Sequence, residues 1–412
     1  MSETVYRLRS SDRGTVLPLA ALVFAPLTEE DTPIVHRVFI AGQDILDYQV
    51  RAAHQAGAQH ILVFAERLTA HILATSDRLA RDDIKIEIVR TPEEAADHLH
   101  PDELTLVVAA NVIAAPQVYR LLMQADKARV LGLRDMEGLE SLERIDGFTR
   151  WSGLALMSGT LIRQTARTVG EWDYARTLLR QALQSGVELE VDDPRHADAP
   201  LIAIVHDQAK ATAVNNAFLM RNPAATAGLI EHYLWAPLVS ALVPPLLRAG
   251  VQPDIWVAAL GLSVLLTLAS IWLTPFMVPL LLFLATGVAA QVAQRLLQIS
   301  LRKMDRLDII LAGRLVVGGL ALLGEATQLV NYGFGWGSYI LTLWLLIEMA
   351  RLALFDPWLL GKRSLPVWRA SPDAVALSLV VGHLLNRDLL ALELILAYAI
   401  VTNTILLVRS RS

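Results

Sequence analysis

Residues 255–273 read IWVAALGLSVLLTLASIWL, and these 19 residues contain no ionisable side chain. An α-helix rises 1.5 Å per residue, so the stretch would extend about 28 Å as a helix. That length matches the hydrocarbon core of a bilayer, which is about 30 Å thick. The stretch therefore predicts a helix that spans a membrane.

Five further apolar stretches follow this one and predict five more membrane helices. They cover residues 276–297, 307–326, 337–355, 373–386 and 388–408. The stretch at 373–386 is short and is interrupted by Gly382 and His383, so it is the least regular of the set. Together the six stretches predict an all-α transmembrane domain.

Basic residues lie on one side of these spans, and this asymmetry predicts their orientation, because cytoplasmic loops carry the excess of Lys and Arg. They follow the second, fourth and last spans: Arg295, Arg302, Lys303, Arg306, Lys362, Arg363, Arg369, Arg409 and Arg411. The opposite connections include the aromatic turn NYGFGWG at 331–337 and a turn that carries Arg387 alone. The pattern predicts a multi-pass protein of the cell inner membrane, with both termini and the N-terminal domain in the cytoplasm.

The composition of the whole chain excludes several classes of protein. Of its 412 residues, 54% are hydrophobic and 19% are charged, against roughly 25% charged in an average soluble domain. The net charge of −5, from 36 Lys and Arg against 41 Asp and Glu, argues against a nucleic-acid partner. The absence of Cys excludes disulfides, iron–sulfur clusters, thiolate zinc sites and cysteine nucleophiles.

Residues 1–210 have the strand–helix rhythm of a mostly parallel, Rossmann-like α/β sheet. The strand-like runs are VLPLAALVF, HRVFIAG, HILVFAE, IKIEIV and LTLVVAA. Helical segments cover Asp44–Ala56 and Pro116–Ala125. Because the runs are continuously apolar, we expect the strands to be buried on both faces.

The first of these runs allows a second interpretation. It follows Arg7, Arg9 and Arg13, so it also resembles a short signal peptide. Its apolar core is only about ten residues long, and Pro26 would follow the one cleavage-like triplet. A buried first strand is therefore the preferred interpretation.

These patterns divide the chain into three parts. We expect an α/β domain over residues 1–204, a linker over 205–250 and a membrane domain over 251–412. Within the linker, LIEHYLWAPLVSALVPPLL at 229–247 is amphipathic and is expected to lie at the membrane interface. The Pro244–Pro245 pair is expected to break or kink this helix.

Four segments carry a resemblance to a known family. They are AGQDILDYQVRAAHQAGAQHILVF at 41–64, LTLVVAANVIAAPQVYRLL at 104–122, ELEVDDP at 188–194, and LIEHYLWAPLVSALVPPLLRAGVQPD at 229–254. In these segments and in its order of parts, the chain resembles the fused inositol-phosphate cytidylyltransferase/CDP-alcohol phosphotransferase enzymes. The resemblance implies a nucleotidyltransferase-like domain followed by a six-helix phosphotransferase-like domain.

The nucleotidyltransferase motifs of that family are not retained. The family holds a triphosphate in a Gly-rich loop, because backbone N–H groups approach phosphate closely only where Cβ is absent. The corresponding segment, ALVFAPLTEEDTPIVHR at 21–37, has no Gly and carries Glu29, Glu30 and Asp31. The position of the metal-binding Asp falls at Ala109–Asn111, and only Asp192 resembles a retained carboxylate.

The membrane motif is degenerate in the same way. Enzymes of this type hold two divalent ions on four carboxylates in D-x-x-D-G-x-x-A-R-x8-G-x-x-x-D-x-x-x-D, and these ions polarise the pyrophosphate. The best alignment lays TGVAAQVAQR at 286–295 over the first half. Five residues are then the vestigial site positions. Thr286, Ala289 and Gln294 stand in the first half of the motif, and Asp305 and Asp308 lie near its second pair of carboxylates.

This pattern predicts a catalytically degenerate pseudoenzyme with a structural or regulatory role in phospholipid-headgroup biosynthesis. The alternative is a divergent active CDP-alcohol phosphotransferase or nucleotidyltransferase that makes a phospholipid headgroup. No metal or other cofactor is expected in the first case. Mg²⁺ is expected only in the second, with Asp192, Asp305 and Asp308 as weak candidate ligands. Three or more carboxylates converging within about 5 Å between the second and third spans would favour the enzyme.

Partners follow from the same region. Arg295, Arg302 and Lys303 predict a site for an anionic lipid headgroup or a phosphate at the cytoplasmic end of the second span. The bilayer itself, a second copy of the chain or an active homologue are the other expected partners.

Three remaining features have structural interpretations. Glu348 and Arg351 are spaced for an i,i+3 ion pair. The segment GRLVVGG at 313–319 favours close helix packing. His98 and His100 lack the helical i,i+4 spacing of a metal pair.

Overall fold

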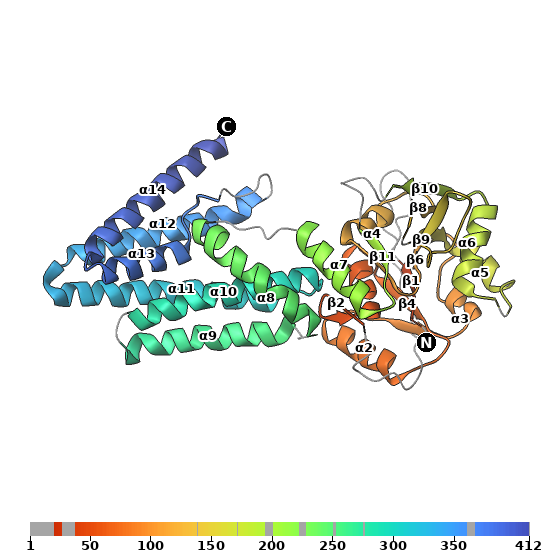
Figure 1. The fold of residues 1–412 in the computed structure, drawn as a ribbon, viewed down its shortest axis with the longest axis horizontal. Helices are drawn as coiled ribbons and strands as arrows, with labels where there is room; N and C mark the ends of the chain where they lie inside the picture. The colour runs from red at the N-terminus through yellow and green to blue at the C-terminus, as the bar shows by residue number, and fades with distance from the viewer. Residues whose placement is uncertain are drawn as a thin grey trace. The chain divides into compact units, whose positions relative to one another are not determined.

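The computed structural model describes residues 20–26, 38–137, 139–170, 172–193, 201–221, 228–249, 253–274, 277–360 and 367–411. The chain forms two compact units. One comprises residues 1–221 together with 300–302, and the other comprises 222–299 together with 303–412. The first is an α/β unit and the second is helical (Figure 1).

A seven-stranded sheet forms the centre of the α/β unit, in the order β10-β8-β9-β6-β1-β4-β5. Its strands are β1 (Ala20–Phe24), β4 (His60–Phe64), β5 (Glu87–Val89), β6 (Leu104–Val108), β8 (Arg129–Arg134), β9 (Thr149–Ser158) and β10 (Glu188–Asp192). All neighbours are parallel except for β9, which is antiparallel to both β6 and β8. The predicted mostly parallel α/β sheet is confirmed.

Helices follow most of the strands, as a parallel sheet requires. They are α1 (Ile45–Gln55), α2 (Ala70–Arg81), α3 (Pro92–Asp97), α4 (Pro116–Met123), α5 (Gly159–Ala166), α6 (Tyr174–Gln184) and α7 (Gln208–Arg221). Every residue of β1 and β6 is buried, which agrees with the continuous apolar runs of the sequence. The helices at 44–56 and 116–125 are confirmed to within two residues at each end.

One predicted strand does not belong to the main sheet. Over its described residues, 38–42, HRVFIAG contributes only β2 (Phe39–Ile40), which pairs with β3 (Gln43–Asp44) in an isolated hairpin. The reason is the turn between them, where Ala41 and Gly42 both have positive φ, of 53° and 74°. Two such residues make a tight hairpin turn, so the chain reverses before a long strand can form. A second small ladder joins β7 (Val112–Ala114) to β11 (Ile202–Ile204).

The helical unit begins with the stretch predicted to be interfacial. After Gly228 it forms a π-helical turn, η2 (Glu231–Trp235), and continues as α8 (Ala236–Arg248). Pro244 and Pro245 lie inside α8 and do not end it, which corrects the expectation of a break. The fixed φ of proline is compatible with a helix, so each proline removes its own backbone donor and crowds the carbonyl four residues earlier without ending α8.

Six further helices follow: α9 (Pro253–Leu273), α10 (Met277–Ile299), α11 (Asp305–Leu329), α12 (Gly337–Leu360), α13 (Pro372–Leu384) and α14 (Asp388–Arg411). A turn η3 (Val330–Phe334) extends α11, and Gly333 with φ of +91° kinks the chain there. Gly318 allows close packing of α11 on α10, because a Cβ at that position would lie 2.7 Å from the Phe283 ring.

Four segments of the described chain are long and apolar enough to cross a membrane: Pro253–Leu273, Met277–Ile299, Asp305–Phe334 and Asp388–Val408. This number is smaller than the six spans predicted. The stretch at 373–386 forms α13, which has 13 residues and is shorter than the roughly 20 residues that a spanning helix needs.

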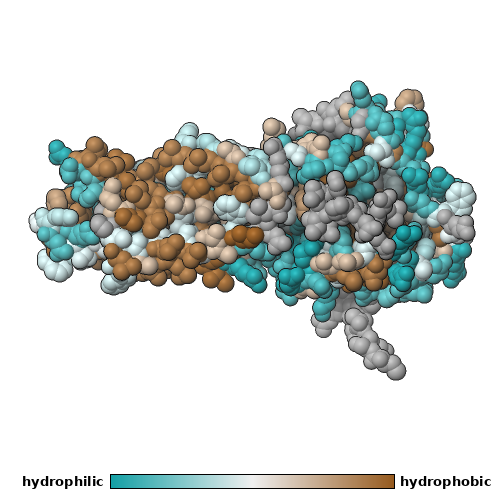
Figure 2. Space-filling view, turned by 60° about the horizontal axis from the view of Figure 1, so that its bottom comes forward, coloured by the Kyte–Doolittle hydropathy of each residue, from teal (hydrophilic) through white to brown (hydrophobic). Residues whose placement is uncertain are grey.

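Apolar side chains also cover the outside of this unit. Figure 2 shows a face on which hydrophobic residues gather over the helices, whereas the α/β unit is mostly hydrophilic. Large residues such as Leu265 and Trp272 on α9 are 62% and 85% exposed. An apolar exterior of this extent is typical of a surface that contacts lipid.

Candidate functional site

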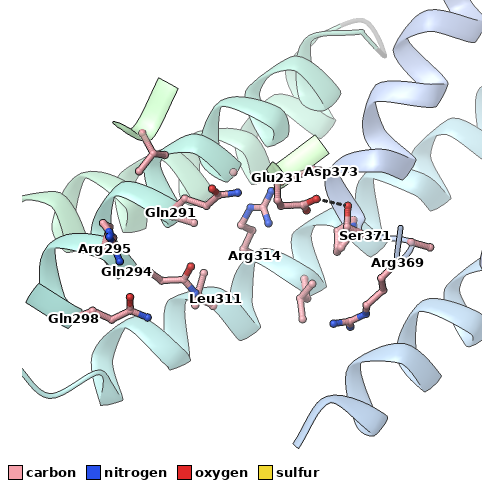
Figure 3. Close-up of a pocket in the computed structure, with 16 residues that line it drawn as sticks. Glu231, Gln291, Gln294, Arg295, Gln298, Leu311, Arg314, Arg369, Ser371 and Asp373 are labelled. Carbon is pink, nitrogen blue, oxygen red and sulfur yellow. Dashed lines mark hydrogen bonds and ion pairs between the residues drawn. The ribbon is translucent and has the colours of Figure 1, made fainter. Parts of the chain in front are cut away.

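The helical unit contains a polar pocket of about 310 Å³. Its walls are η2, α8, α10, α11 and the start of α13, and Figure 3 shows Glu231, Arg314 and Ser371 converging near Asp373. The polar lining residues are Glu231, Gln291, Gln294, Arg295, Gln298, Arg314, Arg369, Ser371 and Asp373. Polar side chains among apolar helices are costly unless they serve a function or pair with one another.

Helix α10 supplies a polar stripe to this pocket. Gln291, Gln294, Arg295 and Gln298 are spaced i, i+3, i+4 and i+7, so they lie on one face of the helix. Gly287 lies one turn before the stripe, and a Cβ there would be 2.5 Å from Asp373 Oδ2. The glycine therefore lets the carboxylate of α13 approach the backbone of α10.

Arg314 of α11 lies at the centre of the pocket's polar contacts. Its guanidinium forms an ion pair with Asp373 Oδ1 and donates from Nε to Thr286 Oγ1 at 2.7 Å. It also lies over the Phe283 ring, 4.2 Å from the centroid. The side chains of Arg314 and Asp373 are 9% and 3% exposed, so the pair is buried.

The other carboxylate of the pocket, Glu231, is held by the start of α13. Ser371 is the N-cap of that helix, where its hydroxyl accepts from Ala374 N at 3.2 Å and donates to Glu231 Oε2 at 2.9 Å. Trp235, one turn after Glu231, donates from Nε1 to Asp373 Oδ2 at 3.0 Å. Burial, together with the nearby charge of Asp373, raises the pKa of Glu231 to about 7.

These residues do not fit a divalent metal site. The two carboxylates come from η2 and α13, and Asp373 already bonds both Arg314 and Trp235. Among the described residues of the helical unit, no three carboxylate or imidazole groups bring their donor atoms within 4.8 Å of one another. The lining carries three arginines and two carboxylates, so its net charge is positive. This charge opposes the binding of a divalent cation.

The structure brings together only part of the predicted site. Gln294 and Arg295 line the pocket, and Thr286 lies beneath it as the acceptor for Arg314. Ala289 packs with the apolar cluster of α9 and α10 instead. Asp305 and Asp308 lie exposed on the first turn of α11, and neither they nor Arg302 and Lys303 are among the pocket's lining residues.

The sequence interpretation missed the cationic centre of this site. Arg314 stands inside the third apolar stretch, within the segment GRLVVGG that was assigned to helix packing alone. Asp373 and Glu231 were also passed over. The available signal was the rule that an ionisable residue within a membrane helix marks a functional position.

A second cavity, of about 420 Å³, lies in the α/β unit at the carboxyl ends of β1, β4 and β6. Its aromatic lining includes Phe24, Phe64, Trp151 and Tyr174. Its charged lining residues are Glu66, Glu143, Asp173 and Arg176. Arg176 Nε lies 3.4 Å from Glu143 and 3.7 Å from Asp173, so its charge is already compensated.

The carboxylate candidates of this unit do not meet in that cavity. Asp192 ends β10, and two strands separate β10 from β6, a distance of about 14 Å at the usual strand spacing. Asn111, which follows β6, lies 3.5 Å from His206 through its amide nitrogen. Glu29, Glu30 and Asp31 lie outside the described residues.

We expect this cavity to show no measurable affinity for Mg²⁺/CTP. Its lining is acidic apart from a compensated arginine, and a triphosphate would be repelled. Titration calorimetry of the full chain in detergent should show no saturable heat, with Mg²⁺/ATP as a parallel control. A dissociation constant below about 1 mM, or about 4 kcal/mol of affinity, would contradict this prediction.

No protein-family model matches the chain, and no curated protein matches it significantly. Solved structures similar to its N-terminal half include CMP:2-keto-3-deoxy-manno-octonic acid synthetase complexed with CTP, at 12% identity and a TM-score of 0.35, over 49% of this chain and 99% of that one. A 4-diphosphocytidyl-2C-methyl-D-erythritol synthase gives 12% and 0.35, over 50% and 100%. HddC from Yersinia pseudotuberculosis gives 10% and 0.33, over 48% and 99%.

Proposed function

We propose that this chain is a membrane protein related to CDP-alcohol phosphotransferases that binds an anionic lipid headgroup without a metal and is a catalytically degenerate pseudoenzyme. The observation that carries the proposal is the place of Arg314. Its guanidinium bonds Thr286, which the sequence resemblance aligns with the first metal-binding carboxylate of the family. A fixed cation therefore lies where an active relative would need an acidic ligand.

The remaining polar groups suit a phosphate group. Arg295 and Arg369 stand at opposite sides of the pocket in Figure 3, with Gln291 and Gln294 of α10 between them. Guanidinium and amide N–H groups both donate to phosphate oxygens, and the guanidinium fork matches phosphate geometry. The pocket lies among helices with an apolar exterior, which favours a lipid as the carrier of the phosphate.

The pocket arginines are expected to bind the headgroup, and the loop cations of the sequence prediction are not. Each basic group near an anionic lipid contributes about 1 kcal/mol. The double variant Arg295→Gln/Arg369→Gln should therefore lose about 2 kcal/mol, or roughly thirtyfold in retention of phosphatidylglycerol measured by native mass spectrometry. The matched variant Arg302→Gln/Lys303→Gln should retain the lipid as the unmodified chain does. Equal losses in both variants would contradict the pocket as the binding site.

Removing metal separates this proposal from the alternative of an active enzyme. EDTA should leave lipid retention unchanged; a decrease in retention would mean that a metal holds the headgroup in this pocket. One observation favours residual catalysis, namely Glu231, whose pKa of about 7 suits a general base. It could accept the proton of an acceptor hydroxyl while that oxygen bonds to phosphorus and CMP leaves. Release of CMP from a CDP-alcohol in EDTA, lost in Glu231→Gln, would support that second function.

A further inference from the structure

Three side chains of the α/β unit converge at the amino ends of two neighbouring strands. His60 is the first residue of β4, Glu87 is the first residue of β5, and His98 directly follows α3. Glu87 Oε2 lies 3.2 Å from His60 Nε2 and 2.8 Å from His98 Nδ1. A single carboxylate oxygen is thus shared by two imidazoles.

The backbone fixes this convergence. In the parallel ladder, Glu87 pairs with Leu62, so His60 is its diagonal neighbour on the same face of the sheet. Helix α3 starts directly after β5, where the Thr91 hydroxyl accepts from Glu94 N at 3.2 Å. The helix lasts six residues, and the N–H of His98 donates to the Glu94 carbonyl at 3.3 Å. This short, capped helix therefore places His98 beside the first residues of β4 and β5.

We propose that His60, Glu87 and His98 form a Zn²⁺ site. Two imidazole nitrogens and one carboxylate oxygen are a known zinc donor set, with the fourth position left to water. Metal–ligand distances of about 2.0–2.1 Å place the ligand atoms of a tetrahedral site about 3.4 Å apart. The three donor atoms already lie within 4.8 Å of one another, so only small side-chain adjustments would bring them onto one ion.

The surroundings of the site are consistent with this role. The side chains of Glu87 and His98 are 52% and 45% exposed, so an ion and a water can enter, while that of His60 is 12% exposed and anchors the site. The site lies at the amino ends of the strands, whereas the 420 Å³ cavity lies at their carboxyl ends. Zn²⁺ binding here therefore does not depend on a nucleotide in that cavity or on the lipid proposal.

The test is a calorimetric titration of the tag-free full chain in detergent with Zn²⁺ alone. We expect a site that is lost or weakened at least about tenfold in Glu87→Gln and in His98→Gln. The control is His100→Gln, because His100 lies two residues away and its ring instead accepts from Asp102 N at 3.3 Å. Affinity that is unchanged in Glu87→Gln and His98→Gln, or lowered equally in His100→Gln, would overturn the site.

A second measurement keeps the test valid if a variant fails to fold. Co²⁺ added to the unmodified chain should give the visible absorption of a tetrahedral site, and stoichiometric Zn²⁺ should remove it. No such absorption, or absorption that Zn²⁺ does not displace, would also overturn the proposal. Far-ultraviolet circular dichroism identifies variants whose loss of binding reflects unfolding.

Discussion

Replacing Arg314 by methionine is expected to destabilise the protein by about 3–5 kcal/mol, because it leaves the buried carboxylate of Asp373 without its cation. The remaining bond to that carboxylate, from Trp235, is neutral and cannot compensate the charge. The hydroxyl of Thr286 also loses its donor, and the Phe283 ring loses its cation. The free energy of unfolding in detergent, measured by denaturant titration, checks the value.

Two further variants isolate the ion pair from a general effect of mutation. Arg306→Met makes the same substitution on an exposed arginine of the same helix and should change the free energy of unfolding by less than about 0.5 kcal/mol. Adding Asp373→Asn to Arg314→Met should restore much of the loss, since the buried charge is then removed. Strictly additive losses in the double variant would show that the two side chains are not coupled.

The α/β architecture was predictable because its signal is local. Continuous apolar runs at 20–24, 60–64 and 104–108 became the three central parallel strands, and each is buried. The strands β8 and β9 were missed, although β9 is ten residues long. β9 is antiparallel and no helix stands between it and β8, so the strand–helix rhythm does not reveal β9. β8 follows the predicted helix α4, but its apolar run is short and is interrupted by Gly132.

The helical half was predicted in outline from hydropathy, but its site was not. Apolar length identifies a span and says nothing about which neighbouring helix a polar residue faces. Arg314 meets a carboxylate 59 residues away on α13, the short helix whose span was the least regular of the six. The i,i+3 pair of Glu348 and Arg351 was predictable because it is local, at 3.3 Å, whereas the cross-helix bond from Asn403 to Glu348 was not.

The histidines illustrate the same limit. His98 and His100 were judged by helical spacing, and by that criterion they form no metal pair. The partners of His98 are set by strand register and by the return of α3, and these place His60 and Glu87 beside it. Sequence separations of 38 and 11 residues carry no local pattern that would indicate such a convergence.

Glu231 is expected to make the stability of the protein fall as pH rises from about 4.5 to about 7. Burial raises its pKa to about 7 in the folded chain from the usual 4.5 of a glutamate, so within this window the folded state holds a proton that the unfolded state has lost. Stability decreases with pH wherever the folded state binds more protons. Above pH 7 the full effect is at most about 3 kcal/mol, at 1.36 kcal/mol per pKa unit.

Glu231→Gln should remove this dependence while keeping an acceptor for the Ser371 hydroxyl. The variant should match the unmodified chain near pH 4.5 and exceed its unfolding free energy by up to about 3 kcal/mol at pH 8. The charge of Asp373 raises this pKa and that of Arg314 lowers it, so the window should move when either is replaced. Protonation of Glu231 also leaves the pocket more positive, so an anionic headgroup should bind more tightly at pH 6 than at pH 8. Equal pH profiles for the variant and the unmodified chain would mean that Glu231 ionises as an ordinary surface carboxylate.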